Sequence, residues 1–174
     1  EQRTRLTDEE VIARCPWATT GRTHHRTPNI ITSLELDPAE MEKRNIHLQK
    51  KYAEIEENEV RFEELHCEDA EYLIVAFGSC ARIAQKAMEM AREEGIKVGL
   101  LRPITLWPFP SKAIAARAAQ VKGILTVELN AGQMVEDVRL AVECKVPVEH
   151  FGRLGGIVPD PDEVITALKE KLIK

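Results

Sequence analysis

The fold of this chain is decided by residues 73–80, which read Leu-Ile-Val-Ala-Phe-Gly-Ser-Cys. Five apolar residues in a row are typical of a strand that is buried on both faces of a parallel sheet. A glycine and a serine then supply a turn, and small or apolar residues recur at spacings of three and one from Cys80 to Ala91, which predicts one buried face of a helix. Gly95 stands where a left-handed residue would end that helix.

The same alternation of strand and helix continues to the C-terminus. Short apolar patterns predict strands at 98–101, 124–127 and 146–151, and a helical stripe follows each of them. Ser111 is predicted to cap the helix after the first of these strands, and Asp160 the last helix. Strands that alternate with helices predict a three-layer α/β domain, with a mostly parallel sheet, right-handed crossovers and helices on both faces.

Residues 1–71 have a different character from residues 72–174, and we predict that they form a largely helical N-terminal arm ahead of the α/β domain. The arm holds 17 acidic and 10 basic side chains, whereas the domain holds 12 and 14. Thr7 and Asp37 each begin a helix-start pattern, and the second opens a long helix with an acidic end. Its narrow apolar seam resembles a coiled-coil edge and consists of Met41, Leu48, Tyr52 and Ile55. We expect this arm to pack across the domain or onto a partner.

Composition excludes several classes of protein. With 44% hydrophobic and 30% charged residues, the 174-residue chain is typical of a soluble globular protein. It holds no apolar run of transmembrane length and no basic stripe, so neither a membrane nor a nucleic acid is a predicted partner. The four cysteines, which lack Cys-x-x-Cys spacing, argue against a zinc or iron–sulfur site and favour the reducing cytoplasm. Because the chain starts at Glu1 and not at methionine, we expect it to be part of something longer.

A proline-rich loop follows the predicted strand at 98–101. Residues 102–110 contain three of the nine prolines, together with Trp107 and Phe109. Proline fixes φ and keeps the preceding residue out of the helical region, so this loop is predicted to be stiff and extended. Its aromatic side chains either fold back onto their own domain or are covered by a partner.

Polar side chains follow the predicted strands at one edge of the sheet, where open α/β sheets bind ligands. The candidates for a functional edge or an interface are Arg102, Trp107, Phe109, Glu128, Asn130, Gln133 and His150. They do not form a complete acid–base or nucleophilic set, so no catalytic, cofactor-binding or metal-binding residue is predicted. The turn at 78–80 could bind an anion, and Cys80 could be a nucleophile, but a plain turn and a buried thiol are favoured.

The motifs resemble the α subunit of 2-oxoacid:ferredoxin oxidoreductases. The resemblance rests on residues 102–110 (Arg-Pro-Ile-Thr-Leu-Trp-Pro-Phe-Pro) and 127–134 (Val-Glu-Leu-Asn-Ala-Gly-Gln-Met). Residues 29–33 and 52–56 also look like the branched-chain, 2-oxoisovalerate type. From about Glu71 onward, the chain is similar to the C-terminal domain shared by transketolase and other thiamine-diphosphate enzymes.

This resemblance implies an oxidative decarboxylation, in which a 2-oxoacid, coenzyme A and oxidised ferredoxin give an acyl-CoA, carbon dioxide and reduced ferredoxin. It implies that thiamine diphosphate, Mg²⁺, coenzyme A and an iron–sulfur cluster belong to the complete enzyme, with none held by this fragment. The implied partners are a missing N-terminal domain of the same subunit, the other subunits and, through the complex, ferredoxin. The fragment would then be a non-catalytic assembly part, with Trp107 and Phe109 in a domain or subunit interface.

Two other functions stay open on the sequence. A stand-alone α/β domain could bind a small ligand or anion at the turn 78–80. An unrelated assembly module could use its acidic helix, through residues 53–71, to bind a basic partner with strong salt dependence.

Overall fold

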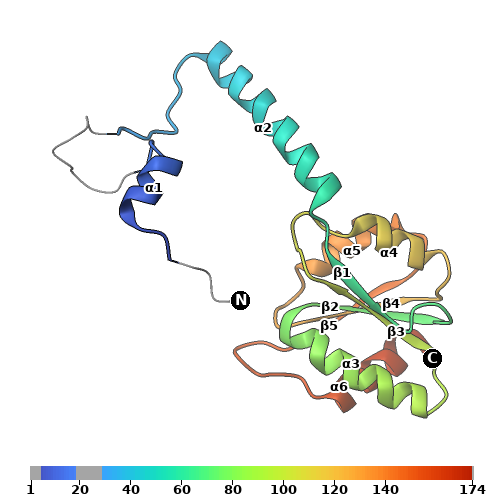
Figure 1. Ribbon diagram of the computed structural model, residues 1–174. Helices are drawn as coiled ribbons and strands as arrows, with labels where there is room; N and C mark the ends of the chain where they lie inside the picture. Colours follow the sequence, from blue (N-terminus) through green and yellow to red (C-terminus); the bar gives the residue numbers. More distant parts are fainter. Residues whose placement is uncertain (1–4, 19–28, 174) are drawn as a thin grey trace. The chain divides into compact units, whose positions relative to one another are not determined.

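The structure is a computed structural model that describes residues 5–18 and 29–173. It divides into two compact units, residues 1–47 and residues 48–174. The elements along the chain are, in order, α1 (Asp8–Arg14), α2 (Pro38–Asn58), β1 (Phe62–Leu65), β2 (Tyr72–Ala76), α3 (Gly78–Glu93), β3 (Val98–Pro103), α4 (Ser111–Ala118), β4 (Ile124–Glu128), α5 (Met134–Val142), β5 (Val148–Gly152), α6 (Pro161–Leu168) and the π-helix η1 (Lys169–Ile173) (Figure 1).

The first unit holds α1 and the beginning of α2. The Thr7 hydroxyl accepts a hydrogen bond from the Glu10 backbone, and the Glu10 carboxylate accepts one from the Thr7 backbone. This reciprocal capping box confirms the predicted start of α1. Asp37 Oδ1 accepts hydrogen bonds from the first backbone N–H groups of α2, which contains no buried residue along its 21 residues.

The second unit is built on a sheet with the strand order β1-β3-β2-β4-β5. Strands β3, β2, β4 and β5 run parallel to one another, and β1 runs antiparallel to β3 at the edge of the sheet. In β2, the side chains of Leu73, Ile74 and Val75 are at most 1% exposed, because helices cover both faces of this central strand. The prediction of an α/β fold with a mostly parallel sheet is confirmed.

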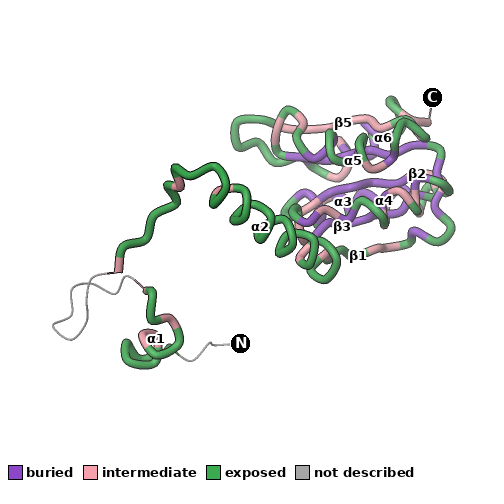
Figure 2. The backbone as a smooth tube through the Cα atoms, turned by 90° about the horizontal axis from the view of Figure 1, so that it is seen from above, coloured by how far each residue is buried: buried purple, intermediate pink, exposed green. Residues whose placement is uncertain are grey.

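Helices α3 and α6 lie on one face of the sheet and α4 and α5 on the other (Figure 1), and the central strands are largely buried (Figure 2). Helices α3 and α6 enclose one core, in which Met88, Leu100 and Leu168 are almost completely buried. Helices α4 and α5 enclose the other core, around Leu101 and Ile114. Each face therefore has its own apolar layer, as predicted for a sheet with helices on both faces.

Strand β1 was not predicted, since residues 62–65 were assigned to the N-terminal arm. The segment lacks the apolar alternation of a strand, but it pairs with β3, and charge pairs add to this attachment. The Glu64 carboxylate accepts two hydrogen bonds from the Arg117 guanidinium of α4, at 2.7 and 2.9 Å. On the same strand, Glu63 pairs with Arg102 of β3 at 2.8 Å. The bond from Arg117 holds the pKa of Glu64 below its ordinary value.

The helix ends follow most of the predicted signals. The Asp160 capping box at the start of α6 is present, and Gly95 adopts a left-handed φ of 85° after α3. The prediction that Ser111 caps α4 is wrong: Ser111 is the first helical residue, Pro110 takes the capping position, and no side chain bonds there. Within the residues that the structure describes, no helix is long and apolar enough to cross a membrane.

Candidate functional site

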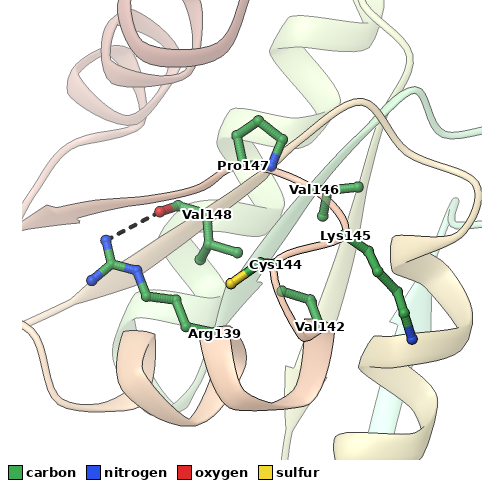
Figure 3. Close-up of a pocket in the computed structure, with 7 residues that line it drawn as sticks. All are labelled: Arg139, Val142, Cys144, Lys145, Val146, Pro147 and Val148. Carbon is green, nitrogen blue, oxygen red and sulfur yellow. Dashed lines mark hydrogen bonds between the residues drawn. The ribbon is translucent and has the colours of Figure 1, made fainter.

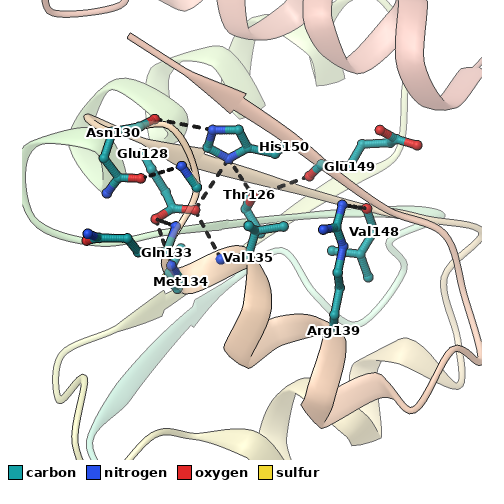
Figure 4. A network of polar contacts seen from close by, with 11 residues as sticks. Thr126, Glu128, Asn130, Gln133, Met134, Val135, Arg139, Val148, Glu149 and His150 are labelled. Atoms are coloured by element: carbon teal, nitrogen blue, oxygen red, sulfur yellow. Dashed lines mark hydrogen bonds and ion pairs between the residues drawn. The ribbon is translucent and has the colours of Figure 1, made fainter. Parts of the chain in front are cut away.

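Glu128, the last residue of β4, caps the helix that follows it. Its side chain is fully buried, and its carboxylate accepts hydrogen bonds from the backbone N–H groups of Gln133, Met134 and Val135 at 3.1, 2.8 and 3.0 Å (Figure 4). Gln133 stands at the N-cap of α5 but makes no side-chain cap. The strand therefore supplies the acceptor that the free N–H groups at the helix start need, and the helix dipole favours its negative charge.

His150 of β5 joins this carboxylate to the loop beyond it. Its Nδ1 lies 3.3 Å from Glu128 Oε1 and 3.3 Å from the Thr126 hydroxyl, while its Nε2 lies 3.3 Å from the backbone carbonyl oxygen of Asn130. The Asn130 side chain turns back and accepts a hydrogen bond from the Gly132 N–H at 2.8 Å. The imidazole thus bridges β4, β5 and the loop 129–133 (Figure 4).

Gly152 makes room for this arrangement and was missed among the sequence candidates. A Cβ atom at Gly152 would overlap the Asn130 carbonyl oxygen and lie 2.7 Å from His150 Nε2. The requirement is one of close approach, because the φ angle of Gly152 is not in the left-handed region. The available sequence signal was a glycine directly after the strand predicted at 146–151.

This cluster positions the start of α5 and the loop before it. Glu128 has no surface exposed to a substrate, and its oxygens already accept three N–H groups and face an imidazole. The hydroxyl that contacts His150 is that of Thr126, which is also fully buried. A buried carboxylate that is satisfied in this way holds a helix start and a loop in place.

The proline loop is held by hydrogen bonds to Arg61 and by one within the loop. The backbone N–H groups of Ile104 and Thr105 donate to the Arg61 carbonyl at 2.9 and 3.1 Å, and the Thr105 hydroxyl donates to the Pro108 carbonyl at 2.8 Å. The Trp107 ring is 55% exposed and meets the Tyr52 ring edge to face, with the centroids 5.5 Å apart.

The structure brings together only some of the predicted candidates. Glu128, Asn130 and His150 form one cluster, which Gln133 joins through its backbone. Arg102 lies on β3, which β2 separates from β4, and it pairs with β1 instead.

The two aromatic candidates of the proline loop differ in their burial. Phe109 is half-buried against the core under α4 and α5, as the folding-back interpretation expected. Trp107 points to solvent beside Tyr52. Only Trp107 therefore keeps most of its surface available to a partner.

The turn at the start of α3 contains a buried thiol. Cys80 is 3% exposed, and burial together with the charge of Glu128 raises the pKa of its thiol. A raised pKa disfavours the reactive thiolate, which supports the interpretation as a core residue over that as a nucleophile. Gly78 has a φ of 56°, and α3 begins after Phe77 without a side-chain cap.

An open pocket of about 420 Å³ lies at the amino edge of the sheet, opposite the edge that holds Glu128 and Asn130 (Figure 3). Its walls come from the end of α5 and the segment leading into β5, and they are Arg139, Val142, Cys144, Lys145, Val146, Pro147 and Val148. Arg139 donates a hydrogen bond to the Val148 carbonyl at 3.2 Å, which occupies a free acceptor of the edge strand. None of the predicted candidates lines this pocket.

The donor atoms do not gather into a metal site in the part of the chain that the structure describes. No group of three or more His, Cys, Asp or Glu side chains there is placed to hold a metal ion. Cys67 and Cys80 lie in different cores on opposite faces of the sheet, and Cys144 is exposed. These residues do not fit an iron–sulfur cluster or a magnesium diphosphate.

The known proteins whose sequences resemble this chain include oxidoreductase subunits. Residues 70–164 match the family described as pyruvate:ferredoxin oxidoreductase core domain II. The ketoisovalerate oxidoreductase subunit VorB of Methanothermobacter thermautotrophicus is 46% identical over 165 residues. This match covers 93% of the chain but 46% of VorB, so the chain spans less than half of that relative's length.

Two solved structures share the fold. A 2-oxoglutarate:ferredoxin oxidoreductase from Magnetococcus marinus, with 2-oxoglutarate, coenzyme A and succinyl-CoA bound, superposes with a TM-score of 0.68 and 25% identity. The superposition covers 78% of this chain and 24% of that one. A split-gene transketolase, an inactive β4 tetramer, gives a TM-score of 0.56 at 21% identity, over 65% of this chain and 41% of that one. The second likeness confirms the transketolase-like fold alone.

Proposed function

The chain belongs to the pyruvate:ferredoxin oxidoreductase core domain II family, and we propose that it is the C-terminal part of a 2-oxoacid:ferredoxin oxidoreductase subunit of the 2-oxoisovalerate type. The complete enzyme converts a branched 2-oxoacid, coenzyme A and oxidised ferredoxin to the acyl-CoA, carbon dioxide and reduced ferredoxin. The observation that carries the proposal is the 46% identity to a ketoisovalerate oxidoreductase subunit over nearly the whole chain.

In this proposal the chain has a structural and assembly role. Its polar cluster holds the start of α5 and the loop 129–133 in place. Glu128 is fully buried, and His150 has a partner at both ring nitrogens. Thiamine diphosphate, Mg²⁺, coenzyme A and the iron–sulfur cluster are assigned to other domains and subunits of a cytoplasmic complex. The donor sets of the described residues, which fit neither a diphosphate-bound metal nor a cluster, support that assignment.

The contribution of this chain is to orient its neighbours around a site from which water must be excluded. We place Trp107 in the contact with a neighbouring domain or subunit, because over half of its large ring is exposed on a loop fixed by Arg61 and Thr105. Phe109 supports the loop from beneath by packing into its own core.

The test uses the full-length subunit co-expressed with its partner subunits. The wild-type complex should reduce a viologen dye in a reaction that requires coenzyme A, with 2-oxoisovalerate preferred over 2-oxoglutarate and pyruvate. A complex that turns over none of these 2-oxoacids would refute the proposed function.

The role of the proline loop is tested by Trp107→Ala in the same complex. Truncation of a buried interface aromatic typically costs about 2 kcal/mol or more of binding free energy, so assembly should weaken about 30-fold or more. Leu140→Ala on the outer side of α5, which is 77% exposed, is the matched control. Unchanged assembly and activity for Trp107→Ala would contradict the interface assignment.

The alternative is a stand-alone domain that binds an anion at the turn 78–80. The uncapped start of α3 and the left-handed Gly78 favour it. Titration of the 174-residue chain with inorganic phosphate in a calorimeter decides the matter. Saturable binding that Gly78→Ala abolishes would support this alternative, and the absence of heat would remove it.

A further inference from the structure

The exposed apolar side chains of the second unit gather in three loops. Ten large apolar residues in residues 48–174 are exposed, and seven of them follow the carboxyl ends of β3, β4 and β5, each 46–58% exposed. These seven residues, which we call the carboxyl-edge face, are Ile104, Leu106, Trp107, Leu129, Leu154, Ile157 and Val158.

The topology places the three loops at one edge of the domain. Strands β3, β2, β4 and β5 are parallel, so their carboxyl ends meet at the same edge of the sheet. In Figure 1 the loop after β5 extends outward at that edge, at the end of the sheet where α2 leads into β1. Large apolar side chains that are exposed together at one edge of a soluble domain indicate an interaction surface, whereas single scattered ones do not.

Three of the polar side chains at this edge bond within the domain. Glu128 bonds to the start of α5, the Asn130 amide oxygen accepts from Gly132, and the Thr105 hydroxyl donates to Pro108. The same bonds hold the loops in place, so little ordering is needed when a partner binds. A docked protein surface would bury the apolar side chains of these loops.

The border of the face is acidic on the side of β4 and β5. The first turns of α5 and α6 begin at this edge and carry Glu136, Asp137 and Asp162, all of them exposed. Within the part of the chain that the structure describes, none of these three carboxylates forms an ion pair, whereas the neighbouring Glu163 is paired with Arg153.

We propose that the carboxyl-edge face, formed by the three loops after β3, β4 and β5, docks a neighbouring polypeptide of the oxidoreductase complex that presents apolar side chains bordered by lysine or arginine. This inference rests on the proposed function, in that it takes the partner from the same complex. It extends the contact beyond Trp107 to the loops 129–133 and 153–160, and it states the charge of the partner. The basic border lies opposite the starts of α5 and α6.

The apolar part is tested in the complex of the full-length subunit with its co-expressed partners, by the double variant Leu154→Ser/Ile157→Ser. Both side chains are more than half exposed, so the isolated 174-residue chain should keep its circular dichroism spectrum and melting temperature. The dissociation constant of the complex, measured by mass photometry, should rise about tenfold or more. Leu140→Ser, at a leucine of α5 that is 77% exposed, should leave it unchanged.

The charged part is tested by Glu136→Gln/Asp162→Asn. Removing two carboxylates should weaken assembly several-fold at low salt and flatten its dependence on ionic strength. Wild-type assembly by both double variants would overturn the inference. So would self-association of the 174-residue chain that Leu154→Ser/Ile157→Ser abolishes, because the occupant would then be a second copy.

These readouts do not depend on turnover. A wild-type complex that assembles but reduces no viologen refutes the proposed function, and an active complex that ignores both double variants refutes only the docking inference.

Discussion

Replacing Glu128 with alanine should remove a large part of the stability of the α/β unit. The substitution leaves three backbone N–H groups at the start of α5 without their acceptor, at a position with no exposure to water. It also removes one of the two partners of His150 Nδ1 and leaves the Thr126 hydroxyl as the other. An unsatisfied buried donor costs about 1–3 kcal/mol, and breaking a buried charged contact costs about 3–5 kcal/mol in total. We therefore expect the free energy of unfolding to fall by about 4 kcal/mol and the melting temperature by roughly 10–20 °C.

The assay is urea unfolding of the 174-residue chain, followed by far-UV circular dichroism. Glu128→Gln keeps an oxygen acceptor but loses the charge at the helix start, so it should cost about 1–2 kcal/mol. Glu136→Gln, an exposed carboxylate in the first turn of the same helix, should stay within about 0.5 kcal/mol of the wild type. If Glu128→Ala were no less stable than Glu136→Gln, the capping role assigned to the buried carboxylate would be wrong.

Three further outcomes are expected. The pKa of Glu64 lies below its ordinary value of 4.5, so its ion pair with Arg117 stabilises the fold above pH 4.5 and ceases to do so as the pH falls through the lowered pKa. The free energy of unfolding of Glu64→Gln should therefore be about 1 kcal/mol lower than that of the wild type at pH 7 and equal to it in strong acid. Urea unfolding at each pH measures this difference. Iodoacetamide at pH 8 should modify the exposed Cys144 first and should not modify the buried Cys67 and Cys80 until urea is added. The reason is that burial raises the pKa of Cys67 to about 11 and also raises that of Cys80. Peptide mass spectrometry identifies the modified cysteines. Gly152→Ala should push away the carbonyl that it faces and cost about 2 kcal/mol, and a wild-type urea midpoint would contradict the close approach described.

Periodicity predicted the parts of the fold that depend on apolar burial. The continuous run at 73–77 and the stripe beginning at Cys80 became β2 and α3 because burial on both faces leaves a direct mark on composition. Strand β1 left no such mark. It pairs at an edge of the sheet, and arginines distant in sequence, Arg102 and Arg117, provide its charged contacts. Contacts of that kind depend on tertiary placement and cannot be read from a local window.

The candidate site was predicted in the same uneven way. Glu128, Asn130 and His150 were expected to share an edge because each follows or ends a parallel strand, and β4 and β5 proved to be neighbours. Arg102 was grouped with them because sequence pattern does not specify strand order, and β2 lies between β3 and β4. The internal use of Glu128 as a helix cap was also hidden, since its partners are backbone N–H groups that every sequence has.

Strand β1 has a practical consequence for anyone who shortens this chain. The family match begins at residue 70, and the change in composition suggests a cut at 71, yet both limits would discard the segment paired with β3. The outer N–H and C=O groups of β3 would then be bare beside the apolar Leu100 and Leu101. An uncovered apolar edge is a template for pairing with other molecules, so a version that starts at residue 72 should precipitate or form fibrils where one that starts at residue 59 stays dispersed.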